Sequence, residues 1–211
     1  MTVRLQDRLR TGAPGAVLRH DEIPGFGTVT VRVLDPVADL ETLHRWVTQP
    51  RGRFWGLAEL DRDELRDLYA YVDGLETHHA FLLCRDDEPF ALLQTYAPEH
   101  DPVGECYEPR AGDVGLHFFL GEQVADRETQ WAVLVRTIVG FVLGPPGARR
   151  IVVEPDVGNA RATAMLDGLG FEIGPEIALP DKTARLAFLD DARAKSLEAA
   201  VCRVLGAASD H

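Results

Sequence analysis

Residues 113–120 read DVGLHFFL and residues 151–154 read IVVE, with a long helical pattern between them. The first stretch is apolar on both faces apart from one histidine, which is typical of a buried strand. Residues 127–143 carry apolar side chains at the 3.6-residue spacing of a helix: Trp131, Leu134, Val135, Ile138 and Val142. This order predicts a β-α-β unit in which the two strands are parallel neighbours.

Sequence patterns typical of strands and helices continue on both sides of this unit. We expect further strands at residues 28–34, 80–84, 90–96, 171–178 and 184–189. Four further helices are expected, with predicted starts at Asp35-Pro36, at a capping box formed by Asp61 and Glu64, at Asn159, and at Asp190 or Asp191. The charged turn at residues 85–89 predicts a hairpin. The order of elements indicates an α/β fold, a mixed sheet flanked by helices with one clearly parallel pair.

The domain organisation follows from length and from the first residues. A chain of 211 residues has the size of one ordinary domain. Residues 1–27 contain several glycines and prolines and show neither a helical nor a strand period. We therefore interpret residues 1–27 as an N-terminal arm and residues 28–211 as a single domain.

Composition narrows the class of protein. The formal net charge of -12 disfavours a nucleic-acid partner and suits a cationic small substrate. No apolar run has the length of a membrane span or of a secretory signal. The three cysteines are far apart and show no zinc or disulfide spacing, so we expect no metal and a reducing cytoplasmic location.

His117 and Asp156 are the residues with the clearest chemical potential. Because a crossover connection is right-handed, the carboxyl ends of the strands that carry them should meet at one edge of the sheet, where open α/β sheets bind ligands. An imidazole there can accept a proton near neutral pH, with a carboxylate beside it. The alternatives are a buried histidine satisfied by the backbone and an aspartate that only caps a turn.

Other candidate residues have weaker support from the sequence. His78 and His79 have no further ligand at metal spacing, so we favour a solvated strand entry. The segment 50–53 is bracketed by Trp46, Phe54 and Trp55. These aromatic residues are core anchors in one interpretation; in the other, their arginine-rich loop binds an acyl chain or a carboxylate.

Three blocks of residues together resemble the GNAT acyltransferases, and more closely the branch of that family in hydroxamate siderophore biosynthesis. The blocks are residues 44–55 (HRWVTQPRGRFW), 107–118 (YEPRAGDVGLHF) and 150–159 (RIVVEPDVGN). The resemblance extends from about Val31 to Leu189. It implies the GNAT fold, in which two parallel strands splay apart within a mixed central sheet.

The resemblance also implies site residues. It makes His117 and Asp156 the active-site pair and places acyl-CoA between the splayed strands, with its pyrophosphate at a helix start where N–H groups attract anions. The residues expected to bind acetyl-CoA or succinyl-CoA are Phe118, Phe119, Leu120, Arg127, Thr129 and Asn159. Those expected to bind the amine are Trp46, Arg51, Phe54, Trp55, Gln94 and Tyr96. Two departures stand out: residues 122–130 (EQVADRETQ) lack the family's glycines, and Gln94 stands where many relatives place glutamate.

The predicted reaction is acyl transfer from acyl-CoA to the hydroxylamine nitrogen of a small N-hydroxylated diamine or amino acid, such as N-hydroxycadaverine, giving a hydroxamate. His117 is expected to take the proton, Asp156 to orient the hydroxylamine or the imidazole, and a backbone N–H in residues 117–120 to stabilise the oxyanion. The alternatives are a GNAT enzyme that acetylates an ordinary amine (antibiotic or polyamine) and a non-catalytic acyl-CoA-binding module. Other siderophore-pathway enzymes are the partners that the resemblance suggests, with the chain a monomer or a homodimer.

Overall fold

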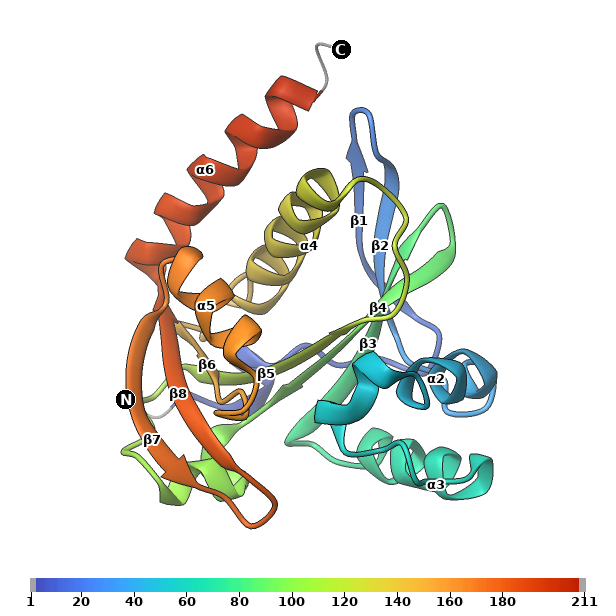
Figure 1. Ribbon diagram of the computed structural model, residues 1–211, viewed down its shortest axis with the longest axis vertical. Coiled ribbons are helices and arrows are strands. Elements are labelled where there is room, and N and C mark those ends of the chain that lie inside the picture. The colour runs from blue at the N-terminus through green and yellow to red at the C-terminus, as the bar shows by residue number, and fades with distance from the viewer. Residues whose placement is uncertain (1–2, 209–211) are drawn as a thin grey trace.

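The computed structural model describes residues 3–208, apart from the side chains of Arg51, Arg53, Ala207 and Ala208. In this part of the chain the strands form one sheet in the order β1-β2-β3-β4-β5-β6-β8-β7 (Figure 1). The strands are β1 (Val17–Ile23), β2 (Gly27–Val33), β3 (His78–Arg85), β4 (Glu88–Tyr96), β5 (Asp113–Leu120), β6 (Arg150–Val153), β7 (Glu172–Ala178) and β8 (Thr183–Asp190). The α-helices are α1 (Leu5–Arg8), α2 (Leu40–Val47), α3 (Arg62–Asp73), α4 (Arg127–Val142), α5 (Ala160–Gly168) and α6 (Asp191–Ala208). Short 3-10 helices span Pro50–Trp55, Pro98–His100 and Pro102–Glu105.

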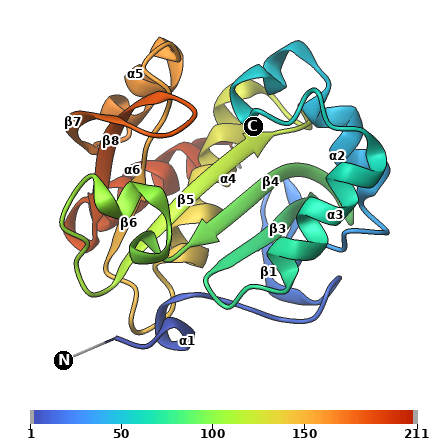
Figure 2. The ribbon, with the colours of Figure 1, turned by 90° about the horizontal axis from the view of Figure 1, so that it is seen from below.

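Helices cover both faces of the sheet. Helices α4 and α6 pack on one face, and α2 and α3 lie on the other (Figure 2). Strand β3 shows how the sequence produces this arrangement: Phe81 and Leu83 join the cluster under α4, while Leu82 and Cys84 join the cluster under α2 and α3. A strand that is buried on both faces has to be apolar at successive positions, which is why residues 80–84 read AFLLC.

The parallel pair β5 and β6 separates partway along its length. Its register joins Asp113 to Arg150, Val114 to Ile151 and Gly115 to Val152, and ends there. Strand β5 continues to Leu120 paired with β4 alone, while β6 pairs with β8 on its far side. The splay predicted for these strands is therefore present, and it opens the sheet at the carboxyl ends of both.

The end at which β5 and β6 remain paired, residues 113–115 and 150–152, is the closed end of the splay. A buried carboxylate stabilises it. Asp113, which is 1% exposed, accepts two hydrogen bonds from the Arg150 guanidinium, at 2.8 and 2.7 Å, and one from the Tyr107 hydroxyl at 3.0 Å. The backbone carbonyl of Asp113 accepts a further bond, of 2.7 Å, from Arg8. These contacts join α1, the segment before β5, and the first residue of β6 at one point.

Much of the predicted organisation is confirmed. The pair joined by α4 is parallel, and all other strand pairs within the described residues are antiparallel. The capping box is present, with both backbone-to-side-chain bonds between Asp61 and Glu64 at 2.9 Å. The hairpin at residues 85–89 is present too, with Asp86 and Asp87 at positive φ in its turn.

Two expectations for the first forty residues were wrong. The supposed arm contains α1 and β1, and β1 pairs with β2 at the edge of the sheet. Its sequence, VLRHDEI, lacks a clean apolar period because an edge strand keeps charged side chains in solvent. Helix α2 begins at Leu40 rather than at Pro36, since Asp35 closes a turn by accepting bonds of 2.9 Å from the amides of Val37 and Ala38.

Candidate active site

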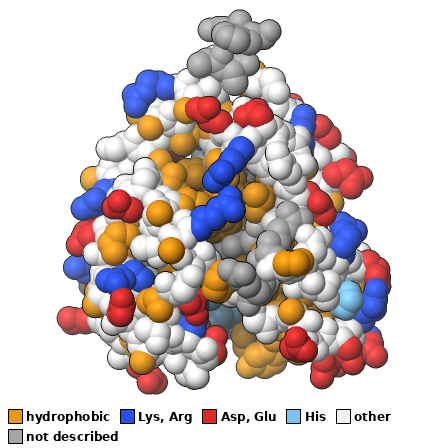
Figure 3. All heavy atoms as spheres, in the orientation of Figure 1, with side chains coloured by type: hydrophobic (Ala, Val, Ile, Leu, Met, Phe, Trp, Pro, Cys, Tyr) orange, Lys and Arg blue, Asp and Glu red, His pale blue; other side chains and the backbone are white. Residues whose placement is uncertain are grey.

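A cavity of about 1040 Å³ occupies the splay between β5 and β6. One wall is the β5 segment 116–120, and the opposite wall is Val153 with residues 154–156. Further lining comes from residues 54–57, from α3, α4 and α5, from Gln94 of β4 and from residues 181–182. Figure 3 shows an apolar hollow on this face of the molecule with Lys and Arg side chains beside it. The position is the one predicted from the topology of the β-α-β unit.

His117 and Glu154 face each other across this opening. His117 Nε2 makes a short hydrogen bond with Glu154 Oε1, and the imidazole side chain remains 37% exposed to the cavity. The Glu154 side chain is only 3% exposed. Its other oxygen, Oε2, accepts a bond of 2.8 Å from the Tyr96 hydroxyl, and the Lys182 ammonium lies 3.5 Å from Oε1.

The charges of this cluster set its protonation. Burial alone would raise the pKa of Glu154, but the neighbouring His117 and Lys182 and the bond from Tyr96 outweigh it and hold that pKa well below its usual range. Burial would likewise lower the pKa of His117, yet Glu154 raises it above its ordinary value of 6.5. Because an ionised carboxylate only accepts hydrogen bonds, Nε2 must be the nitrogen that carries the proton.

The arrangement leaves the second ring nitrogen for chemistry. Nδ1 of His117 makes no hydrogen bond to a described residue, and the ring is packed edge-on against Trp55 with centroids 6.2 Å apart. In the neutral ring Nδ1 is an acceptor. An imidazole whose Nε2 donates to a carboxylate and whose Nδ1 remains an acceptor can take a proton from a bound nucleophile.

Asp156 lines the cavity but is not the carboxylate that contacts the imidazole. Its Oδ1 accepts a bond of 2.6 Å from the Gly158 amide, so the capping role considered from the sequence is present. Of the two roles predicted for Asp156, orienting the imidazole is wrong, because Glu154 occupies that position. The predicted role of Asp156 in orienting the hydroxylamine stays a prediction. Asn159 also lines the cavity and caps α5 through a bond of 3.2 Å from the Ala162 amide.

The residues predicted to bind the co-substrate differ in whether they line the cavity. Phe118, Phe119, Leu120 and Arg127 line the cavity. Thr129 does not line it, and its amide donates a bond of 3.0 Å to the Asp126 side chain, which caps α4. The carboxylate cap therefore occupies the amide that the sequence suggested for a phosphate.

The residues predicted to bind the amine also differ in whether they line the cavity. Phe54, Trp55 and Gln94 line the cavity. Trp46 is fully buried and donates through its indole N–H to Glu122 over 2.8 Å, while Tyr96 is 2% exposed beneath Glu154. Neither therefore reaches the cavity as a contact for substrate. The Arg51 side chain lies outside the described residues.

Four charged cavity residues that the sequence did not single out are Glu154, Arg161, Asp181 and Lys182. Glu154 belongs to the same EPD motif as Asp156, and the face of the strand it occupies depends on register. Lys182 sits in the turn between β7 and β8, far from His117 in sequence, with no local pattern to mark it. Arg161 follows the Asn159 cap on the first turn of α5, where an exposed arginine is common.

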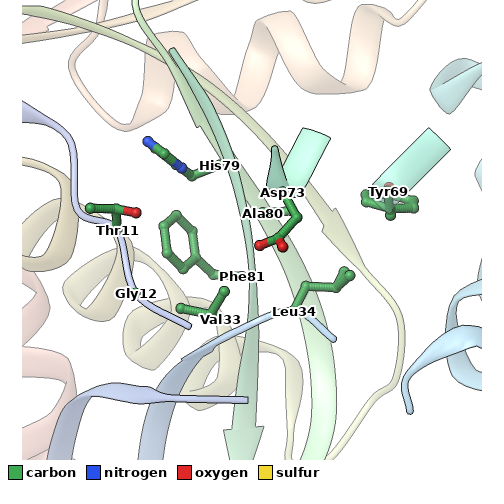
Figure 4. A pocket seen from close by; sticks show the side chains of 9 residues that line it. All are labelled: Thr11, Gly12, Val33, Leu34, Tyr69, Asp73, His79, Ala80 and Phe81. Carbon is green, nitrogen blue, oxygen red and sulfur yellow. The ribbon is translucent and has the colours of Figure 1, made fainter. Parts of the chain in front are cut away.

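The rest of the described chain offers little competing chemistry. The described residues contain no group of His, Cys, Asp or Glu arranged to hold a metal ion. A second cavity, beside His79, Phe81 and Asp73, measures about 10 Å³ and has room for one water molecule (Figure 4). Burial lowers the pKa of His79 there. Among the described helices, none has the length and apolar character needed to cross a membrane.

Comparison with known sequences gives two relatives. The chain is 31% identical over 170 residues to an N(6)-hydroxylysine O-acetyltransferase of Escherichia coli, which covers 77% of this chain and 52% of the relative. It is 24% identical over 152 residues to an N-hydroxyputrescine acetyltransferase of Acinetobacter baumannii, covering 70% of this chain and 71% of the relative. The chain thus spans about half the length of the first relative.

Solved structures share the fold. A protein of Bacillus halodurans superimposes with a TM-score of 0.80 at 18% identity, covering 89% of this chain and 97% of that one. The aminoglycoside acetyltransferase AAC(6')-Ib in complex with coenzyme A gives 0.68 at 22% identity, covering 80% and 98%. The family model for the acetyltransferase (GNAT) domain matches residues 35–179. The chain belongs to the GNAT family of acetyltransferases.

Proposed function

We propose that this enzyme transfers an acyl group from acyl-CoA to the hydroxylamine nitrogen of a small N-hydroxylated diamine or amino acid, forming a hydroxamate. One observation carries the proposal: His117, held from behind by Glu154, faces the cavity between β5 and β6. The names of both sequence relatives support the class of acceptor, since each acts on an N-hydroxylated amine. N-hydroxycadaverine, which the resemblance of the motifs suggests, is the acceptor that we propose to test first.

The cavity suits an acyl-CoA thioester. At about 1040 Å³ it can accommodate an extended pantetheine arm beside the 116–120 edge of β5. Arg127 and Arg161 supply positive charge at the α4 and α5 side of the lining, where phosphates need cationic partners. We therefore assign the phosphates mainly to these arginines, because Asp126 rather than glycine-rich backbone occupies the start of α4.

The chemical step follows from the free nitrogen of His117. A neutral hydroxylamine nitrogen attacks the thioester carbonyl, a C–N bond forms, and Nδ1 takes the N–H proton. The C–S bond then breaks, and the departing thiolate receives that proton as free CoA thiol. Glu154 stabilises the imidazolium in between, and the proposed oxyanion donor is a backbone N–H of β5 within residues 117–120. An N-hydroxylamine is far less basic than an alkyl amine, whose pKa is near 10.4, so orientation matters more than deprotonation.

The acceptor end of the site is lined by Gln94, Asp156 and Asp181. We propose that the carboxylates attract the distal ammonium of a diamine, in keeping with the net charge of -12. We also propose that the enzyme works in the cytoplasm, where acyl-CoA is made, and alongside the enzyme class that N-hydroxylates the amine.

Thiol release tests the proposal directly. We expect acetyl-CoA or succinyl-CoA to release free thiol with N-hydroxycadaverine at a rate at least tenfold above that with cadaverine. A matched pair of acceptors isolates the hydroxyl group, since nothing else differs. Equal rates with both amines would favour an ordinary amine acetyltransferase. CoA binding without thiol release from any acceptor would favour a non-catalytic module.

The pH dependence of turnover follows from the His117–Glu154 pair. A general base works only when it is neutral, and the pKa of His117 is raised above 6.5. We expect kcat to rise with pH and to reach half its maximum above pH 6.5. Glu154 should add no second fall in kcat at low pH, because its pKa is lowered and it stays ionised there. Glu154→Gln should shift the midpoint to lower pH. A midpoint below pH 6.5 in the wild type would contradict this assignment.

A further inference from the structure

The partners of Glu154 define a second layer behind the reacting imidazole. Its two oxygens are held from different elements: Oε2 by the Tyr96 hydroxyl on β4, and Oε1 by His117 on β5 with Lys182 nearby in the β7–β8 turn. Glu154 is 3% exposed and Tyr96 is 2% exposed, so both groups are shielded from bulk solvent. Side chains thus contact both oxygens of the carboxylate.

We propose that Tyr96 and Lys182 are positioning residues that hold Glu154 against His117. In this arrangement Nε2 keeps its proton and donates a hydrogen bond to Glu154, while Nδ1 remains available to the substrate. The inference rests on the proposed function for its effect on catalysis. Its structural content, which nitrogen carries the proton, stands apart from the identity of the acceptor.

Tyr96 is itself held by several neighbours. Its ring stacks on His78 with centroids 5.6 Å apart and lies 5.1 Å from the His117 ring. Gly115 of β5 makes room for it, because a Cβ there would lie 2.2 Å from the ring. A phenol clamped in this way keeps its hydroxyl aimed at Oε2, so the carboxylate plane cannot rotate freely.

Lys182 acts on the other carboxylate oxygen, Oε1. Its ammonium adds a charge at 3.5 Å from Oε1, which keeps the buried carboxylate ionised and therefore an acceptor only. It also lowers the pKa of His117, in opposition to the effect of Glu154. The titratable and charged groups around the imidazole come from several elements: Tyr96, Asp101, Glu154, Asp156, Asp181 and Lys182.

The ¹⁵N chemical shifts of the imidazole test the proposal without substrate. We expect neutral His117 in the wild type to be the Nε2–H tautomer, with its signals assigned by their loss in His117→Ala. Tyr96→Phe and Lys182→Met should each raise the Nδ1–H fraction several-fold and lower kcat about tenfold; for Tyr96→Phe this is the loss expected for one hydrogen bond. The Kd for CoA should change less than twofold. Lys182→Arg keeps the cation and should restore the tautomer.

Matched controls separate this effect from general damage to the fold. Tyr107→Phe removes the same kind of tyrosine bond to a buried carboxylate, Asp113, at the closed end of the splay, and Lys195→Met removes a lysine from the exposed side of α6. Both should leave the tautomer unchanged. Lys182→Met should also move the midpoint of the kcat–pH profile to higher pH, which a purely structural loss would not do.

Two results would overturn the positioning role. One is an Nδ1–H or mixed tautomer in the wild type, and the other is an unchanged tautomer and kcat in folded Tyr96→Phe and Lys182→Met. If instead the tautomer behaves as expected but no N-hydroxylated amine is acylated, the proposed function fails and the positioning role remains.

Discussion

His117→Ala is expected to lower kcat by about a hundredfold or more while leaving the Kd for CoA within about twofold, because a positioned general base contributes on that scale. Nε2 of His117 is bonded to Glu154, which leaves Nδ1 as the nitrogen available to substrate, and no other histidine lines the cavity within the described residues. The side chain is 37% exposed, so its removal should leave the fold intact. The measurement is steady-state thiol release together with calorimetric titration of CoA.

His100→Ala is the matched control, since His100 is exposed on a 3-10 helix outside the cavity. It should keep wild-type turnover. A His117→Ala enzyme that retains turnover would remove the imidazole from the mechanism and leave orientation and backbone donors as the source of catalysis. A loss of CoA binding in the same variant would instead assign His117 to binding of the donor.

The second large effect is expected on stability. Asp113→Ala should lower the free energy of unfolding by about 3–5 kcal/mol, because it leaves the largely buried guanidinium of Arg150 without its carboxylate. For a chain of this size such a loss corresponds to a fall in Tm on the order of 10 °C. Differential scanning calorimetry measures both quantities.

The control for this variant is an exposed ion pair. Asp63→Ala breaks the contact between Asp63 and Arg66 on α3, where solvent screens the charges, and should leave Tm almost unchanged. If Asp113→Ala unfolds at the same temperature as Asp63→Ala, the network at the closed end of the splay does not stabilise the fold as the geometry indicates.

The part of the fold that the sequence predicted is the part with strong local signals. Residues 113–120, 127–143 and 151–154 carry uninterrupted apolar or helical patterns, and handedness alone then makes the two strands parallel neighbours. Strand β1 had no such signal, because an edge strand that faces solvent needs no apolar period. Its place is set by pairing with β2, which is a tertiary interaction.

The candidate site shows the same division. His117 was identifiable as the one polar residue inside an apolar strand that begins at Asp113, and the edge of the sheet was predictable from topology. The choice between Glu154 and Asp156 was not, since both follow β6 within three residues and only the register with β5 decides which one meets the imidazole. Lys182 approaches from a turn whose position depends on how β7 and β8 pack. Thr129 was misplaced because Asp126 competes for its amide.

The identity of the product tests the central claim most directly. The purified enzyme is incubated with acetyl-CoA or succinyl-CoA and N-hydroxycadaverine, and the product is examined by mass and by its colour with ferric iron. We predict a mono-acylated product that binds iron as a hydroxamate, because the acyl group is on nitrogen. An iron-silent product of the same mass, with the acyl group on oxygen or on the distal amine, would contradict the account.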